Sequence, residues 1–138
     1  LLFLVGAKAW QYHWPKMDLI VADDPVRVLV AKTPWHYHRG LGKRASLPQG
    51  IDGMAFLYSR SERYGFVMRD MEFEIDMIWV NQGEIVDIAP NVPLEPGVPE
   101  AELTVYRPRD VANVVLEFPA GRAERMGWKI GDRVSVNE

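Results

Sequence analysis

The sequence contains no cysteine and only three histidines. A chain without cysteine can form no disulfide, no thiolate nucleophile and no thiolate metal site. Positive charge is not in excess either, because 16 Lys and Arg residues face 19 Asp and Glu residues and leave a net charge of -3. Binding to nucleic acid depends largely on positive side chains that neutralise phosphates. We therefore expect no nucleic-acid partner.

No hydrophobic run is long enough for a membrane span, which needs about 20 consecutive apolar residues in a helix. Residues 1–5 are apolar and precede Gly6, Ala7, Lys8 and Ala9. This pattern is typical of the end of a signal peptide with an A-x-A cleavage site and predicts export to the periplasm or cell envelope. The alternative is an apolar strand or arm packed on the domain, which leaves a cytoplasmic location open.

Length and composition predict one folded domain. The chain has 138 residues, of which 48% are hydrophobic and 25% charged, values ordinary for a globular domain. Aromatic residues and Pro15 precede the first strand-like run. We expect an N-terminal arm over residues 1–25 and a single β-rich domain over residues 26–138.

Short β-branched and aromatic runs dominate that domain, and they predict strands. The predicted strands cover residues 17–22, 26–31, 54–58, 66–68, 73–80, 84–89, 103–106, 113–118 and 133–136. Two short helices are also expected. The first begins after Thr33 as N-cap with Pro34 at its first position and ends near Gly40 or Gly42, and the second lies before Gly127. This content, without β–α–β alternation, predicts a mostly β fold: a compact β-sandwich or small barrel-like domain with two short helices.

The sequence has no recognisable catalytic, nucleotide-binding or metal-binding motif. His36 and His38 could hold a metal if they shared one face of a strand. The expected helix over these residues would instead make the two rings diverge by about 200°. We therefore predict partly exposed helix histidines, no bound metal and no cofactor.

Two acidic residues interrupt apolar strands. Asp76 shares a face with Ile78 and Val80, and Glu117 follows three apolar residues. An unpaired buried carboxylate is costly, so each acid needs an arginine partner, hydrogen bonds or a functional role. A structural ion pair and a ligand-binding site are both compatible with acids at these two positions. For Glu117 we predict a structural role, in which the carboxylate accepts hydrogen bonds from a neighbouring strand or pairs with an arginine such as Arg44.

Several segments, in order over residues 26–136, resemble the domain-of-unknown-function 192 family. The matching segments are Ala31–Pro34, Arg39–Arg44, Gly53–Phe56, Phe66–Asp70, Ile75–Asp76, Val115–Gly121 and Gly127–Val134. The sequence departs from the family pattern at Val67, Asp70, Met71 and Glu74. The resemblance implies a compact β-rich fold, often behind an N-terminal signal or anchor, and no established activity.

The family-like segments suggest a binding or accessory domain of the cell envelope that holds a small polar or anionic ligand or a partner segment. Arg69 and Asp76 are expected to converge on one concave surface. The candidate ligand-binding residues are Arg39, Arg44, Met68, Arg69, Asp70, Asp76 and Glu117. The alternative is a small enzyme that uses Asp76 or Asp70 as general base with an arginine holding an anionic substrate. A third interpretation, a DNA-binding hairpin at residues 127–134, conflicts with the net acidity.

Overall fold

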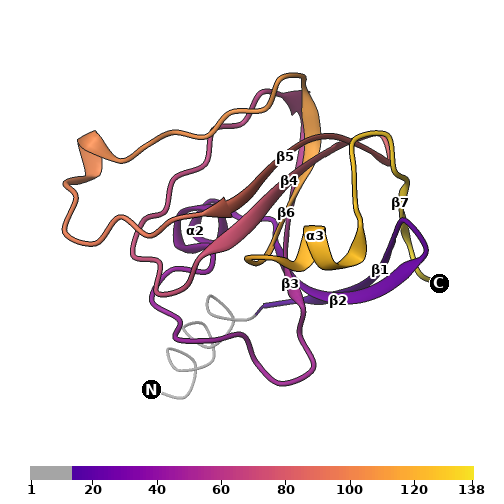
Figure 1. The fold of residues 1–138 in the computed structure, drawn as a ribbon, viewed down its shortest axis with the longest axis horizontal. Helices are drawn as coiled ribbons and strands as arrows, with labels where there is room; N and C mark the ends of the chain where they lie inside the picture. The colour runs from indigo at the N-terminus through magenta and orange to yellow at the C-terminus, as the bar shows by residue number, and fades with distance from the viewer. Residues whose placement is uncertain (1–13) are drawn as a thin grey trace, which may run out of the picture.

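Seven strands form one curled sheet in the computed structural model, which describes residues 14–138 (Figure 1). The strands are β1 (Lys16–Val21), β2 (Asp24–Ala31), β3 (Gly53–Glu62), β4 (Ile75–Asn81), β5 (Glu84–Val92), β6 (Ala112–Pro119) and β7 (Val134–Val136). The helices are α2 (Pro34–Arg39), α3 (Arg122–Met126) and the single 3-10 turn η1 (Glu100–Glu102). The expected mostly β, barrel-like class with two short helices is confirmed.

The sheet has the order β5-β4-β6-β3-β2-β1-β7. All neighbours pair antiparallel except β2 and β3, which are parallel. A parallel pair needs a crossover connection, and α2 together with the segment up to Asp52 provides it. The fold therefore contains one β–α–β unit, formed by β2, α2 and β3, within an otherwise antiparallel sheet.

The two edge strands meet, so the curled sheet closes on itself at one end. Glu84 at the start of β5 bridges Arg133, just before β7. Next to this bridge, the Ile85 N–H donates to the Asp132 carbonyl at 2.9 Å, and the Val134 N–H donates to the Gly83 carbonyl at 2.9 Å. Closure satisfies edge groups that would otherwise pair with other chains.

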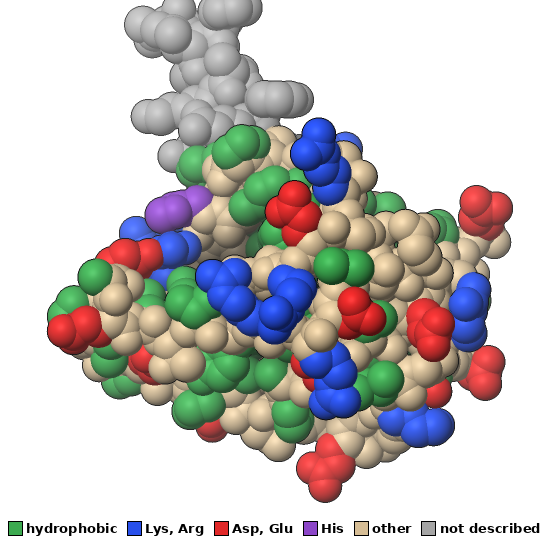
Figure 2. All heavy atoms as spheres, turned by 90° about the horizontal axis from the view of Figure 1, so that it is seen from above, with side chains coloured by type: hydrophobic (Ala, Val, Ile, Leu, Met, Phe, Trp, Pro, Cys, Tyr) green, Lys and Arg blue, Asp and Glu red, His purple; other side chains and the backbone are tan. Residues whose placement is uncertain are grey.

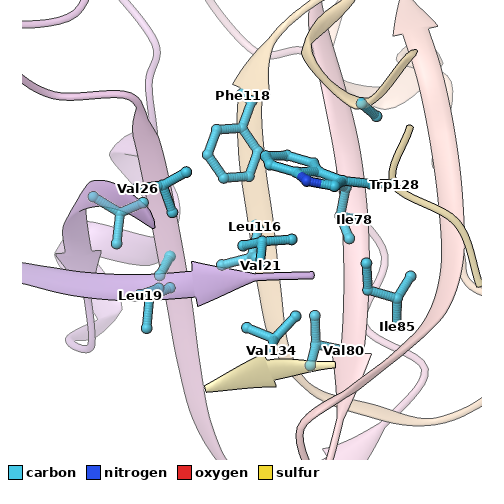
Figure 3. Packing of buried hydrophobic residues seen from close by; sticks show 13 residues of the cluster. Leu19, Val21, Val26, Ile78, Val80, Ile85, Leu116, Phe118, Trp128 and Val134 are labelled. Atoms are coloured by element: carbon cyan, nitrogen blue, oxygen red, sulfur yellow. The ribbon is translucent and has the colours of Figure 1, made fainter. Parts of the chain in front are cut away.

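One core lies inside the curl, and a second lies on the opposite face of the sheet. Figure 3 shows the inner core, in which side chains from β1, β2, β4, β5, β6 and β7 point toward one another. The second core contains Leu41, Met68 and Val115 and lies where α2 and residues 66–71 pack. Side chains alternate between the two faces along β6. Leu116 and Phe118 therefore enter the inner core, while Glu117 faces the second.

The helix boundaries follow the local signals. The Thr33 hydroxyl accepts from the His36 N–H at 3.1 Å, and α2 ends at Gly40, whose φ is 50°. Gly127 closes α3 with φ 70°, in the left-handed conformation that glycine adopts without strain.

Three expectations change in the structure. Residues 16–21, expected in the arm, form β1 between β2 and β7. Residues 66–68 and 103–106 contribute only the isolated bridge between Phe66 and Tyr106. The interpretations of residues 1–9 lie outside the described residues. In the part that is described, no helix is long and apolar enough to cross a membrane.

Candidate functional site

Five of the seven candidate residues line two adjoining pockets. The inner pocket has a volume of about 30 Å³ and is lined by Arg39, Arg69 and Glu117, among others. The outer pocket, about 120 Å³, is lined by Met68, Arg69 and Asp70 together with residues 95–98, 100 and 103 of the following loop. The two pockets share Arg69 and Met71, and we call them together the groove. Its walls come from the end of α2, residues 66–71, β6 and the loop that carries η1.

Glu117 lies at the buried end of the inner pocket. Its neighbours in the sheet are Met54 on β3 and Met77 on β4, and only 4% of the residue is exposed. No residue within 14–138 forms a hydrogen bond or ion pair with its carboxyl group. Burial raises the pKa of Glu117 to about 8. At neutral pH the group is therefore mostly protonated and can donate a hydrogen bond.

Within the described residues, Glu117 neither pairs with Arg44 nor accepts hydrogen bonds from a neighbouring strand, so both expected structural roles are wrong. The Arg44 guanidinium instead lies over the ring of Trp14, 5.2 Å from its centroid. Burial and the neighbouring Arg39 lower the pKa of Arg44. Arg44 is thus held against an aromatic face outside the groove. This contact could not be predicted from the sequence, because Trp14 and Arg44 are far apart along the chain.

Arg69 lies at the boundary between the two pockets. Its Nε donates to both carboxylate oxygens of Glu100, at 2.9 and 3.1 Å, and its Nη2 also bonds Glu100. Its Nη1 donates to the His38 carbonyl at 3.1 Å. Arg69 in turn lowers the pKa of Glu100. The guanidinium is therefore fixed between the end of α2 and the η1 loop.

Close backbone contacts shape the rim of the groove. A Cβ at Gly42 would lie 2.9 Å from the Arg69 carbonyl and 3.0 Å from the Arg39 carbonyl, so only glycine lets these segments meet. The Lys43 N–H donates to the Asp70 carbonyl at 2.7 Å. Asp70 itself has φ 54°, a conformation in which Asp and Asn are enriched. The backbone conformation at position 70 therefore suits either Asp or Asn.

Asp76 does not share the groove, so its expected convergence with Arg69 is wrong. Asp76 is fully buried on the face of the inner core, whereas Arg69 lies beside α2 on the other face. The Asp76 carboxylate accepts from the N–H groups of Asn91 at 2.8 Å, Gly121 at 3.3 Å and Ala123 at 2.9 Å. It holds the start of α3 in place and is not positioned to act as a general base for a ligand in the groove.

The two helix histidines differ in exposure. His36 is 4% exposed, against the expected partial exposure. Its ring lies 4.2 Å from that of Trp14, and its Nδ1 accepts from the Lys32 N–H at 3.5 Å. His38 is exposed. Within the described residues, no three or more His, Cys, Asp or Glu side chains form a group that could hold a metal ion.

Sequence reasoning missed a wider cavity of about 500 Å³ between residues 45–52, 73–74 and 119–122. Asp52 and Arg122 line it and form an ion pair at 3.2 Å. The Arg122 guanidinium also lies over the rings of Phe118 and Trp128. No motif links these segments in the sequence. Asp52 compensates the charge of Arg122, although Arg122 Nε is buried without a hydrogen-bond partner. Glu117 forms no ion pair or hydrogen bond among the described residues, and for this reason we place the candidate site in the groove.

Comparisons with known proteins agree with this fold. A family model for DUF192, described as an uncharacterized group, matches residues 18–136. A crystal structure of a candidate transcription regulator from Sinorhizobium meliloti 1021 is 26% identical with a TM-score of 0.73, covering 91% of this chain and 95% of that one. A protein of unknown function from Novosphingobium aromaticivorans DSM 12444 is 25% identical with a TM-score of 0.72, covering 88% and 84%. No curated protein matches the chain. The chain belongs to the DUF192 family.

Proposed function

We propose that this chain is a non-enzymatic binding domain of the cell envelope that holds a small polar or anionic ligand in the groove. One observation carries the proposal: Glu117 is buried in the inner pocket, which Arg39 and Arg69 also line, and none of residues 14–138 forms a hydrogen bond or ion pair with its carboxyl group. A desolvated acid in a concave site is a functional-site candidate, because burial without compensation costs stability.

The chemistry of the groove suits an oxygen-rich ligand. A protonated Glu117 donates a hydrogen bond to an oxygen acceptor, and Arg39 and Arg69, which line the same pocket, add positive charge to the groove. The inner pocket, at about 30 Å³, has room for about one water molecule or one small ligand group. The ligand would therefore place one polar group beside Glu117 and the rest in the outer pocket.

The enzyme alternative is weaker because only one of its two general bases remains available. Asp76 is held by three backbone N–H groups away from the groove. Asp70 does line the outer pocket but is exposed. It lacks the buried setting in which catalytic carboxylates are usually found.

A thermal-shift screen with small carboxylic acids, phosphate, sugars and metabolites tests the proposal. A ligand at 100 times its Kd should add roughly 2.7 kcal/mol to the free energy of unfolding. Arg69→Gln should remove the shift, while Arg125→Gln, which changes an exposed arginine on α3, should retain it. A shift that survives Arg69→Gln, or the lack of any shift, would count against a binding role of the groove.

The proposed location rests on the apolar residues 1–5 and the following A-x-A pattern. Fractionation of cells that express the tagged protein from its own gene tests it. Recovery in the periplasmic or membrane fraction supports the envelope, and recovery in the cytosol alone contradicts it.

We propose no nucleic-acid partner, although one structural relative is described as a candidate transcription regulator. The chain has a net charge of -3. The face in Figure 2 carries several basic side chains near its middle with acidic side chains around them, whereas nucleic-acid interfaces favour continuous positive surfaces. Fluorescence anisotropy with labelled duplex DNA at low salt should show no saturable binding by this chain.

A further inference from the structure

We infer that the ligand of the groove carries a carboxylate, and that the carboxylate of Glu100 occupies the ligand's position when no ligand is bound. This inference rests on the proposed function and names its ligand class. It starts from the contact between Arg69 and Glu100, which bridges the end of α2 and the η1 loop.

The contact has the geometry of a bound carboxylate. Both oxygens of Glu100 lie within hydrogen-bond distance of Arg69 Nε, at 2.9 and 3.1 Å, and Nη2 bonds the same group. A guanidinium binds a planar carboxylate through such a fork. The Arg69 side chain is oriented independently by its bond to the His38 carbonyl. Arg69 thus presents a preformed carboxylate site whose present occupant is a side chain of the same protein.

Glu100 is weakly held, so a ligand can replace it. Its side chain is 61% exposed, and ion pairs at such exposure contribute little to stability. No described residue other than Arg69 bonds its carboxylate. Glu100 belongs to the short turn η1 on a loop that projects from the sheet in Figure 1. Release of Glu100 therefore leaves the strands and helices intact.

The other charges of the groove favour a monocarboxylate over a phosphate. Asp70 and Glu95 line the outer pocket beside Glu100, and they would repel a dianion more strongly than a single negative charge. The two pockets, about 30 and 120 Å³, are also smaller than ordinary cofactor sites. A small hydroxy or keto acid fits these limits. Its carboxylate would take the place of Glu100 on Arg69, and its second oxygen would accept a hydrogen bond from Glu117.

The test uses the full chain and titrates glycolate, acetate and inorganic phosphate at constant ionic strength, with binding followed by NMR chemical shifts. Glu100→Gln should tighten glycolate binding about fivefold, because it removes the competing negative charge. Glu102→Gln, a change in the same turn outside the groove lining, should leave the Kd unchanged. Arg69→Gln should abolish binding, and Arg69→Lys should weaken it at least tenfold, since it keeps the charge but loses the fork.

The outcomes separate the two proposals. If Glu100→Gln does not tighten binding while Arg69→Gln still abolishes it, the role of Glu100 is wrong and the binding function stands. If phosphate binds more tightly than glycolate and acetate, the ligand class is wrong. If none of the three probes binds the wild type or the Glu100→Gln variant, the carboxylate inference fails. Binding of another class in the thermal-shift screen would then leave the binding function in place.

Discussion

Two buried acids on neighbouring strands have opposite roles. Asp76 receives three backbone N–H bonds at the start of α3, whereas Glu117 has no such donors within the described residues. The sequence indicated both as unusual, because each interrupts an apolar strand. It could not tell them apart, because the donors of Asp76 come from residues 91, 121 and 123, which only the folded sheet brings to it.

The pH dependence of stability should reveal the uncompensated Glu117. Its pKa is about 8 in the folded protein and about 4.3 when unfolded. Between these values the folded state keeps a proton that the unfolded state has lost. The contribution of Glu117 to stability is therefore full below about pH 4.3 and falls as the pH rises toward 8.

Glu117→Gln removes this dependence. We expect the variant to be more stable than the wild type at pH 8 by on the order of 3–5 kcal/mol, and the difference to shrink toward zero near pH 4.5. Urea unfolding at several pH values measures it, with the exposed Glu124→Gln as control. A difference between variant and wild type that stays constant from pH 5 to 8 would show that Glu117 does not titrate as described.

Asp76→Asn should instead make the protein less stable. One carboxylate oxygen becomes an amide N–H₂, so at least one buried backbone donor at the start of α3 loses its acceptor. Loss of a hydrogen bond to a charged group with an unsatisfied partner costs roughly 2–3 kcal/mol. Denaturant unfolding at pH 7 measures it. A change below about 0.5 kcal/mol would mean that the carboxylate does not hold the helix start.

At the scale of elements, local signals predicted most boundaries. Thr33, Pro34 and Gly40 indicated α2, and Gly127 indicated the end of α3. The parallel pairing of β2 with β3 was not predictable, since it depends on where the long crossover returns and not on the composition of either strand. Five of the seven predicted site residues were found in the groove, because the family-like segments pack together. The sequence did not indicate the wider cavity, because no motif links the segments that line it.

The pairing of β3 with β6 depends on one close approach. A Cβ at Gly53 would lie 2.2 Å from the Glu117 carbonyl and 2.8 Å from the Phe118 ring. Gly53→Ala must push the two strands apart and should cost about 3 kcal/mol, the upper part of the range for overpacking. Gly97→Ala, where nothing lies within 4 Å but φ is 74°, should cost only about 1–2 kcal/mol. Equal denaturant midpoints for the two variants would contradict the close approach.

At the scale of the whole molecule, the curl of the sheet creates two separate interiors. The inner core gathers apolar side chains from all seven strands. The opposite face, covered by α2 and residues 66–71, contains the groove and Glu117. The acid is desolvated only because segments far apart in the sequence close over it, so its ionisation reports on the assembled domain.

The most direct measurement is therefore the pKa of Glu117 in the intact domain, followed through its side-chain carboxyl ¹³C chemical shift. The account predicts a midpoint near pH 8, well above that of an exposed glutamate such as Glu124. A midpoint near 4.3, the ordinary value for glutamate, would mean that the carboxyl group is solvated or paired. It would remove the observation on which the proposed binding site depends.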